Sequence, residues 1–345
     1  MNSTAAAPAD SPSSRPLMVT LLLVIGIPCI ILLTLLSIAQ GNLNLPISQS
    51  WELMWSAKTT EANSILVHDT RMPRAIAAVL IGSMLAVAGA IMQGLTRNPL
   101  ADPTIFGVSQ GATFAVALGL ALVPSITTTG LSLFSLAGAA LGVGLVFLVG
   151  AFSRGGLSPA KLALAGTAIG MLLSSFATIV SLQFNVAKDL TFWYAGGLVG
   201  MDWEIITFVA PLGVAGLVLA IALSKGITTI SFGEDVAVGL GSKLGVTKVL
   251  GNLAVLLLTG SAVSMAGYVG FVGLIVPHLT RYLVGSDYRV IIPCSAVLGA
   301  ILLLLADMLG RIISPPFEVP VSVVTTLIGV PFFVYLASRE RRTSL

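Results

Sequence analysis

Charged residues are scarce in this chain of 345 residues: Asp, Glu, Lys and Arg together make up only 9%. A typical soluble domain carries about 25% charged residues, because its surface must face water. With 56% hydrophobic residues and a mean hydropathy of +1.02, the chain has too few ionisable groups for such a surface. The composition excludes a soluble enzyme and predicts an all-α polytopic membrane protein.

Cysteine and histidine are also rare, with two residues of each. Cys29 and Cys294 lie in apolar runs far apart in the sequence, so we interpret them as buried thiols and not as a disulfide. Because the histidines and cysteines are scattered, no metal site and no cofactor is expected. The motifs G-x-x-x-x-G-K-[ST], H-E-x-x-H and G-x-S-x-G are absent. No catalytic residue is therefore predicted, and a membrane enzyme is the least favoured class.

Long apolar runs dominate what is present, and most approach the roughly 20 residues that a membrane-spanning helix needs. Residues 1–16 are small and polar, which predicts a disordered cytoplasmic tail, and no cleavage site follows the first run. The eighth run is short and carries Pro277 and His278, so a re-entrant segment is an alternative there. About ten spans are predicted, at residues 17–39, 74–95, 105–123, 131–152, 161–183, 206–224, 249–266, 269–284, 290–310 and 320–337.

The distribution of Lys and Arg predicts the orientation. With ten spans and a cytoplasmic N-terminus, twelve of the 17 Lys and Arg residues fall on the inner side and five on the outer side. This bias agrees with the positive-inside rule and also places the C-terminus in the cytoplasm. The net charge of only +3 gives no reason to expect a nucleic-acid partner.

An internal repeat is visible between the two halves of the chain. Seven residues of the segment 80–107 are identical to the residues 178 positions further on. The repeat halves, about 74–183 and 249–337, begin with spans of opposite direction, so the repeat is inverted, as in many transporters. The alternative is convergence through a shared Gly/Ala-rich packing composition. Both halves belong to one predicted transmembrane domain, residues 17–340.

The longest inner loop, residues 225–248, contains the pattern of a short amphipathic helix. Acidic residues stand in its first turn and glycines follow its end. Such a helix can be a rigid lever seated in the groove of another protein. A helix lying on lipid is the alternative, although its acidic turn disfavours an anionic membrane surface. The residues concerned are Phe232, Gly233, Glu234, Asp235, Val238, Gly239, Leu240 and Gly241.

Three arginines, Arg71, Arg74 and Arg311, fall on the predicted outer side, against the positive-inside bias. Arginine pairs well with carboxylates of a docking protein, and snorkelling to lipid phosphates is the alternative. Asp307 is the one acidic residue well inside a predicted span, and with Arg311 one turn later we interpret it as a helix-surface ion pair. A secondary transporter that works alone would need more intramembrane ionisable groups.

Two long stretches and three shorter ones make the chain resemble the FecCD-type permeases, membrane subunits of ABC importers for ferric siderophores, haem and cobalamin. The long stretches are RMPRAIAAVLIGSMLAVAGAIMQGLTRNPLADPTIFGVSQGA (71–112) and GYVGFVGLIVPHLTRYLVGSDYRVIIP (267–293). ADMLGR (306–311), FEVPVSVVTTLIGVPFF (317–333) and FWYAGGL (192–198) extend the similarity. The resemblance runs from about residue 17 to 340, and the Val321 that follows Pro320 stands where many relatives carry Gly.

The resemblance implies a type II ABC importer permease with ten helices in the bacterial cytoplasmic (inner) membrane. Its expected partners are membrane lipid, a second permease subunit (identical or paralogous), two cytoplasmic ATPases that hydrolyse ATP, and an extracytoplasmic substrate-binding protein. Arg71, Arg74 and Arg311 match the arginines that dock the binding protein, and residues 225–248 match the segment that contacts the ATPase. Helices five and ten border the pathway in the family, which makes pathway candidates of Met171, Ser174, Ser175, Thr178, Val324, Thr325 and Ile328.

The motif residues of the two long stretches also have structural interpretations. Asn98 and Pro99 are expected to end the second span, with Asn98 capping local backbone groups. Gly89 and Gly107 are expected to allow close helix contact. Pro277 is expected to kink or terminate the eighth span. His278 is interpreted as a hydrogen-bonded structural residue, with a ligand role as the alternative.

The sequence thus predicts the permease subunit of a binding-protein-dependent ABC importer, with ATP-driven alternating access and a ferric siderophore as substrate. Haem and cobalamin are the alternatives within the family, and a stand-alone secondary transporter is the alternative from another class. Replacing the three outer arginines together by Glu is expected to abolish docking and leave the subunits assembled.

Overall fold

The fold is known from a computed structural model that describes residues 15–41, 45–103, 107–152, 159–313 and 317–343. The described residues form helices and no strands, which confirms the all-α prediction. Most of the predicted tail, residues 1–14, lies outside them. The long helices are α1 (Pro16–Ala39), α4 (Met72–Thr96), α5 (Val108–Leu122), α6 (Thr128–Phe152), α7 (Pro159–Gln183), α9 (Trp203–Ser231), α11 (Leu244–Ala266), α12 (Val272–Val284), α13 (Tyr288–Ile313) and α14 (Val321–Thr343); the short ones are α2 (Ile47–Trp55), α3 (Ala62–Ile65), the π-helix η1 (Leu66–Arg71), α8 (Ala187–Tyr194) and α10 (Glu234–Gly239).

The ten predicted spans correspond in order to the ten long helices. Seven helical segments are long and apolar enough to cross a membrane, and shorter apolar helices in α5, α12 and α14 stand at the other three predicted positions. With 13 residues, α12 is about 20 Å long, less than the roughly 30 Å of a hydrocarbon core. α12 alone is therefore too short to cross a membrane, and the eighth crossing, like its re-entrant alternative, stays a prediction.

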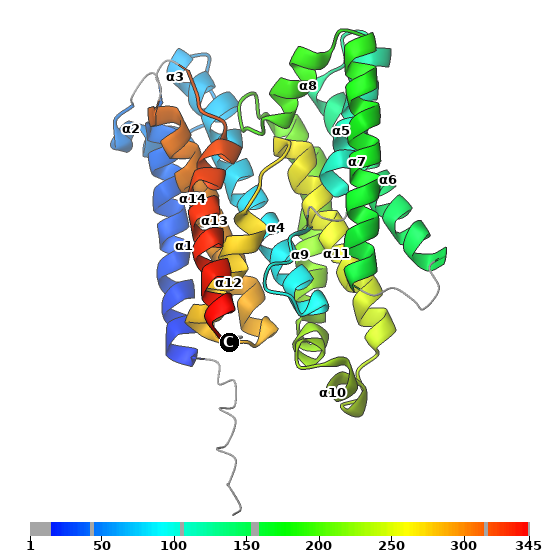
Figure 1. The fold of residues 1–345 in the computed structure, drawn as a ribbon. Coiled ribbons are helices and arrows are strands. Elements are labelled where there is room, and N and C mark those ends of the chain that lie inside the picture. The colour runs from blue at the N-terminus through cyan, green and yellow to red at the C-terminus, as the bar shows by residue number, and fades with distance from the viewer. Residues whose placement is uncertain (1–14, 42–44, 104–106, 153–158, 314–316, 344–345) are drawn as a thin grey trace, which may run out of the picture.

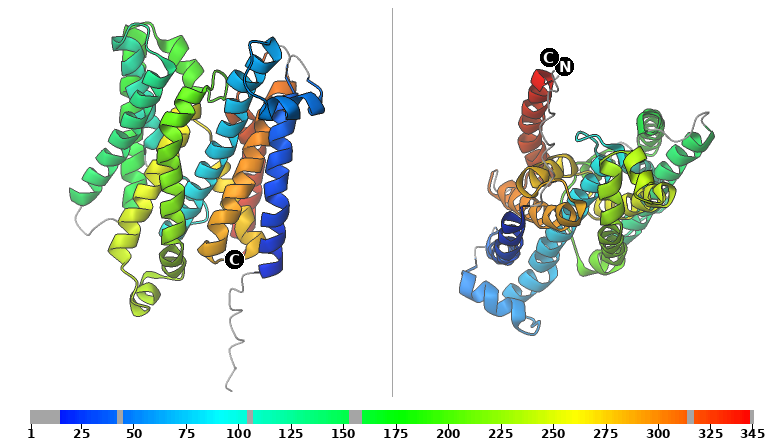
Figure 2. Two further views of the ribbon diagram at one scale, coloured as in Figure 1. Left: turned by 180° about the vertical axis from the view of Figure 1, so that it is seen from behind. Right: turned by 90° about the horizontal axis from the view of Figure 1, so that it is seen from below.

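The helices form a bundle with α4 at its centre (Figure 1). In its apolar window 83% of the residues are buried within the chain, against 17% in α1. α4 packs against α13, α11, α12 and α9; α1 and α14 lie on one side of it and α5–α8 on the other (Figure 2). The helix that begins the chain and the helix that ends it meet the end of the bundle that carries α10, which we call the α10 face; the opposite end, with α2 and α8, is the α8 face (Figure 1).

The two predicted repeat halves contain four long helices each, α4–α7 and α11–α14. α4 runs from the α8 face towards the α10 face, and α11 runs the opposite way (Figure 1). This antiparallel relation is the one that an inverted repeat requires. The boundaries of the halves and of the 17–340 domain stay predictions.

Glycines allow the central helix to approach its neighbours closely. A Cβ built on Gly89 would lie 1.8 Å from the carbonyl oxygen of Gly273 in α12, and one on Gly82 would lie 2.2 Å from that of Gly299 in α13. Between membrane helices, where lipid competes for apolar contacts, such backbone-to-backbone packing supplies much of the association energy. Gly89 therefore has the close-contact role that the sequence predicts.

Gly107 and Pro277 act differently from what the sequence predicts. Gly107 has a φ of +72° as the first residue before α5, so its left-handed backbone conformation is what demands glycine; a Cβ there would meet nothing nearer than 3.7 Å. Pro277 does not terminate its helix, because α12 continues to Val284 and ends at Gly285. Termination at Pro277 is thus wrong, a kink there stays a prediction, and the helix end comes at Gly285, whose φ is +93°.

Asn98, Pro99 and His278 take structural positions. α4 ends at Thr96, and the Asn98 Oδ1 accepts a hydrogen bond of 2.9 Å from the backbone N–H of Leu100, the local capping expected of it. Pro99 follows in the same turn. The ring of His278 lies edge-on to Phe332 of α14, with 5.9 Å between ring centroids.

We predict that Gly89→Ala destabilises the chain by about 1–3 kcal/mol, because the new methyl group must push α4 and α12 apart. Gly144→Ala in α6 is the matched control, since a Cβ there meets no atom within 4 Å. Unfolding of the two purified variants in detergent measures the difference. Equal stability of the two variants would contradict the close packing of α4 on α12.

Candidate functional site

The α8 face contains a charged cluster that is buried except for Glu318, and we define it as Arg71, Arg74, Asp307, Arg311 and Glu318. Arg74 of α4 holds Asp307 of α13 in a two-pronged pair, with its Nη2 2.8 Å and its Nε 3.0 Å from Oδ1. Arg311 donates to Oδ2 of the same carboxylate. Arg74 also pairs through Nη1 with Glu318, 2.8 Å away in the connection before α14.

Asp307 is fully buried, so the predicted helix-surface ion pair is wrong: the side chain is 0% exposed and bridges two helices. A carboxylate in an apolar interior is tolerated only with full compensation, which two guanidinium groups supply here. The spacing of Asp307 and Arg311 in the sequence shows their pairing, but the burial depends on Arg74, 233 residues away.

Two of the three predicted docking arginines cap the end of α1. The Nη1 of Arg71 donates to the carbonyl oxygens of Ile38, at 2.7 Å, and Ala39, at 3.2 Å. The Nη1 of Arg311 donates to those of Ser37, at 2.8 Å, and Gln40, at 3.1 Å. The last carbonyls of a helix have no partner within the helix, and a cation also complements the helix dipole there.

The structure thus brings the three arginines together, but with their guanidinium groups turned to acceptors of this chain. The side chains of Arg74 and Arg311 are 12% and 9% exposed, and Arg71 is buried. Their role in docking stays a prediction. A structural reason for arginines on this face, independent of any partner, is that they hold α1, α4 and α13 together.

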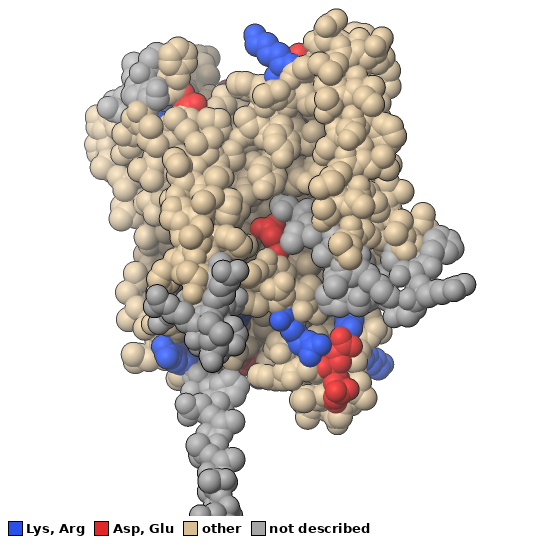
Figure 3. Space-filling view, viewed as in Figure 1, with Lys and Arg blue, Asp and Glu red and all other residues tan. Residues whose placement is uncertain are grey.

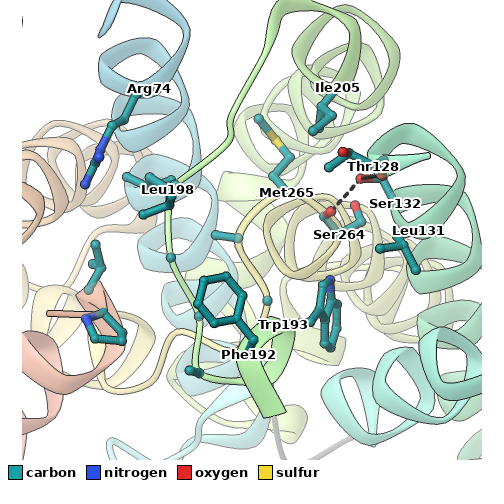
Figure 4. A pocket seen from close by; sticks show the side chains of 18 of the residues that line it. Arg74, Thr128, Leu131, Ser132, Phe192, Trp193, Leu198, Ile205, Ser264 and Met265 are labelled. Carbon is teal, nitrogen blue, oxygen red and sulfur yellow. Dashed lines mark hydrogen bonds between the residues drawn. The ribbon is translucent and has the colours of Figure 1, made fainter. Parts of the chain in front are cut away.

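A cavity of about 410 Å³ adjoins the charged cluster and is a feature that the sequence did not predict. Its walls are α8, the segment 195–199, the end of α11 and the segment 318–321, with the first turn of α6 behind them (Figure 4). Phe192 and Trp193 line it beside backbone of Gly196 and Gly197, and Arg74 and Glu318 stand at its charged side. The sequence signal for this cavity was the aromatic and glycine-rich stretch 192–198.

Hydrogen bonds connect the walls of the cavity. The Ser132 hydroxyl of α6 donates to the carbonyl oxygen of Ser264 in α11, at 2.9 Å (Figure 4). The Ser322 hydroxyl at the start of α14 donates to the carbonyl oxygen of Ala195, which follows α8. Tyr194 and Tyr268 stack with 5.5 Å between ring centroids. The beginning of α14 and the end of α8 are thereby linked.

The pathway candidates on α7 form an uncovered helix face. Met171, Ser174, Ser175 and Thr178 are all exposed in the chain, Met171 to 66%. The hydroxyls of Ser175 and Thr178 donate to carbonyl oxygens one turn back, at 2.8 and 2.9 Å, so they need no partner outside the helix.

The candidates on α14 divide between the surface and the interior. Ile328 is 44% exposed, whereas Val324 and Thr325 are buried, at 4% and 1%. Val324 and Thr325 therefore reach no surface of this chain in the structure. The assignment of all seven candidates to a pathway stays a prediction.

At the opposite end, α10 forms as the loop pattern predicts. The helix runs from Glu234 to Gly239, with Glu234 and Asp235 in its first turn and Gly241 in a left-handed conformation after its end. Gly233, at φ +125°, precedes it and provides no side-chain cap. Ser242 N–H donates to the carbonyl oxygen of Ala237 and closes the helix end.

The surface of α10 combines exposed apolar side chains with a charged flank. Val238 is 60%, Leu240 67% and Phe232 47% exposed. Glu234 pairs with Lys248 of α11 at 2.9 Å, and this hydrogen bond, helped by attraction to Lys248 and Arg97, holds the pKa of the Glu234 carboxyl below its ordinary value. Charged side chains gather towards this end of the molecule, below a wide band that is almost entirely uncharged (Figure 3).

A second polar network near the α10 face was missed by the sequence analysis. The buried Gln93 of α4 donates to the carbonyl oxygen of Leu274 at 3.2 Å, and Arg281 of α12 donates to the Gln93 Oε1 at 2.9 Å and to the Tyr288 hydroxyl at 3.3 Å. The network fixes α12 against α4 and α13. Only the presence of Arg281 in the PHLTR stretch could have signalled it.

This geometry defines a class of protein: a helical membrane bundle in which α7 has an uncovered face. A family model described as the FecCD transport family matches residues 29–339, and the chain belongs to this family of transport permeases. It is similar to the iron(3+)-hydroxamate import system permease protein FhuB of Bacillus subtilis (strain 168), with 48% identity over 96% of this chain and 86% of that protein.

Two further similarities agree with this family. The ferric enterobactin transport system permease protein FepD of Escherichia coli (strain K12) is 39% identical over 92% of this chain and 96% of that protein. A solved inward-facing structure described as a metal-chelate type ABC transporter superposes with a TM-score of 0.79 at 28% identity, over 94% of this chain and 99% of that one. The predicted fold class and family are confirmed.

We predict that Asp307→Asn lowers the free energy of unfolding by about 3–5 kcal/mol, because Arg74 and Arg311 are left as buried cations without a carboxylate. Asp69→Asn is the matched control: its pair with Lys58 is exposed, 42% and 55% for the two side chains, and its loss costs under about 1 kcal/mol. Denaturation of the detergent-solubilised variants measures both. A loss of stability as small for Asp307→Asn as for Asp69→Asn would refute the role of Asp307 in holding Arg74 and Arg311.

Proposed function

We propose that this chain is the permease subunit of a binding-protein-dependent ABC importer that carries a ferric siderophore into the cytoplasm. The observation that carries the proposal is the 48% identity, over nearly the whole chain, to a permease of an iron(3+)-hydroxamate import system. The likeness to a permease named for ferric enterobactin supports the same substrate class. The chain itself has no motif for ATP hydrolysis, so this step belongs to separate ATPase subunits.

The orientation in the bacterial cytoplasmic membrane follows from the distribution of charge. The α10 face, with both helical ends of the chain, lies in the cytoplasm, and the α8 face lies outside. The exposed Val238 of α10 and Leu240 directly after it then seat in a groove of the ATPase, flanked by the ion pair of Glu234 and Lys248. The charged cluster on the α8 face receives the extracytoplasmic binding protein.

The uncovered face of α7 lies against a second permease subunit, identical or paralogous. In that arrangement Met171, Ser174, Ser175 and Thr178 border a conduit between the subunits, together with Ile328 of α14. Hydroxyls already satisfied within α7 bind a passing ligand weakly, which suits a conduit that must release its substrate. ATP-driven rocking of the subunits opens this conduit to one side at a time, and the substrate crosses unchanged.

Substrate import can be tested directly in a strain that lacks this permease. We expect uptake of radiolabelled iron from a ferric hydroxamate siderophore to return when the chain is restored, and uptake of haem iron and cobalamin to stay unchanged. Cells that carry the vector alone are the control. Restored uptake of haem or cobalamin and not of the siderophore would redirect the substrate assignment within the family.

We predict that Val238→Asp and Leu240→Asp each weaken association with the ATPase by at least about tenfold, because each puts a charge into an apolar contact. Leu122→Asp at the end of α5, where Leu122 is 61% exposed, is the control for the same change away from α10. Recovery of an ATPase subunit with a tagged chain, by quantitative mass spectrometry, measures the effect. Undiminished recovery with both α10 variants would refute the coupling role.

A further inference from the structure

The three arginines of the charged cluster differ in what they hold. Arg71 and Arg311 donate to backbone carbonyl oxygens at the end of α1, and a partner could take them only by uncapping that helix. The hydrogen bonds described for Arg74 go to carboxylates and not to the carbonyl oxygens at the end of α1. Arg74 holds two carboxylates, the fully buried Asp307 and the 34% exposed Glu318.

The two carboxylates occupy different edges of the Arg74 guanidinium. Nε and Nη2 face Asp307, while Nη1 faces Glu318 at 2.8 Å. The inner pair is dry and two-pronged, so its loss would strand a buried charge. The outer pair is a single, partly exposed contact of the kind that contributes little to stability. Nη1 is thus the position in the cluster where one carboxylate can replace another at low cost.

We infer that Glu318 is an internal competitor for docking: it occupies the Nη1 of Arg74 until a carboxylate of the binding protein takes its place. The inference rests on the proposed function, because it presumes an acidic binding protein on the α8 face. It makes Arg74 the docking arginine and leaves Arg71 and Arg311 as supports of α1.

Displacement of Glu318 also reaches the cavity. Glu318, Val319, Pro320 and Val321 form one wall of the cavity, and Arg74 contributes to the same space. The Ser322 hydroxyl, directly after this wall, bonds to Ala195 on the wall that follows α8. Release of Glu318 therefore frees the segment 318–321, which is connected to α14 and to the end of α8. The docked and undocked states then differ in this wall of the cavity as well as in the partner of Arg74.

The test is the affinity of the complete transporter for its binding protein. The transporter is reconstituted in nanodiscs, and the host's own ferric-siderophore-binding protein, fluorescently labelled and loaded with ferric siderophore, is titrated against it. The variants are Glu318→Gln, Arg74→Gln and the double variant. Glu204→Gln is the matched control, because Glu204 is an exposed carboxylate at the start of α9 on the same face. Arg74→Lys replaces Arg74→Gln if the latter fails to fold, since Lys keeps a cation beside Asp307.

We expect Glu318→Gln to tighten binding about fivefold, Glu204→Gln to leave it within twofold, and Arg74→Gln to weaken it about tenfold or more. In the Arg74→Gln background, Glu318→Gln should not change the affinity further, because Glu318 no longer has an arginine to occupy. An unchanged or weaker affinity with Glu318→Gln, or the same gain with and without Arg74, would overturn the inference and leave the proposed function standing. Absence of binding to the unaltered transporter would overturn both.

A second measurement, hydrogen–deuterium exchange, reports on the cavity wall formed by residues 318–321. Val319 N–H donates to the carbonyl oxygen of Gly310 at 2.9 Å, so it exchanges slowly with solvent deuterium while the wall is in place. Docking of the binding protein, or Glu318→Gln without it, should speed exchange in a peptide that covers 317–321. Exchange in this peptide that is insensitive to both would refute the link to the cavity.

Discussion

The ion pair between Asp307 and Arg74 is the interaction on which the α8 half of the molecule depends. A carboxylate with no exposed surface in an apolar bundle is stable only while cations share it, and Arg74 and Arg311 approach it from two helices. Once Arg311 is fixed by Asp307, its Nη1 is aimed at Ser37 and Gln40, and it closes the end of α1. One buried charge thus sets the positions of α1, α4 and α13 together.

The rest of the bundle is held mainly by close packing. α4 carries small residues where it meets α12 and α13, and Gly89 and Gly82 bring backbone against backbone. α4 is covered on nearly all sides, whereas only 28% of the apolar window of α7 is buried. An exposed apolar helix in a membrane protein costs nothing in lipid, so α7 is free to serve as an interface.

The sequence was informative where the membrane itself is the constraint. Every backbone group in lipid must form its hydrogen bond within its own helix, so each span is one continuous helix. Its side chains face lipid or other helices, and each span therefore appears in the sequence as a run of apolar residues. The ten runs therefore correspond to ten helices, and the acidic turn and glycines at 233–241 were enough to predict α10.

Features that depend on contacts between distant segments could not be read from the sequence. Asp307 was taken for a surface pair because Arg311 stands one turn away, while Arg74 is 233 residues distant. The left-handed Gly107 and the uninterrupted passage of α12 through Pro277 are set by neighbouring helices. The cavity is formed by segments that lie far apart in the chain, and only the stretch 192–198 hinted at it.

The two ends of the molecule are joined by α9 and α11, the arms of a hairpin whose tip is α10. α9 has 29 residues, about 44 Å of helix, and begins near Ile205 at the cavity before it ends next to α10. α11 leaves α10 and ends at Ala266, also at the cavity, and the two arms pack along each other. A force applied to α10 can be absorbed by tilting this packed pair as a unit or by breaking its packing, and tilting is the cheaper because it keeps the buried contacts. Such a tilt would move Ile205 and Ala266 relative to the wall that contains Glu318, so a displacement of α10 is expected to change the shape of the cavity at the α8 face.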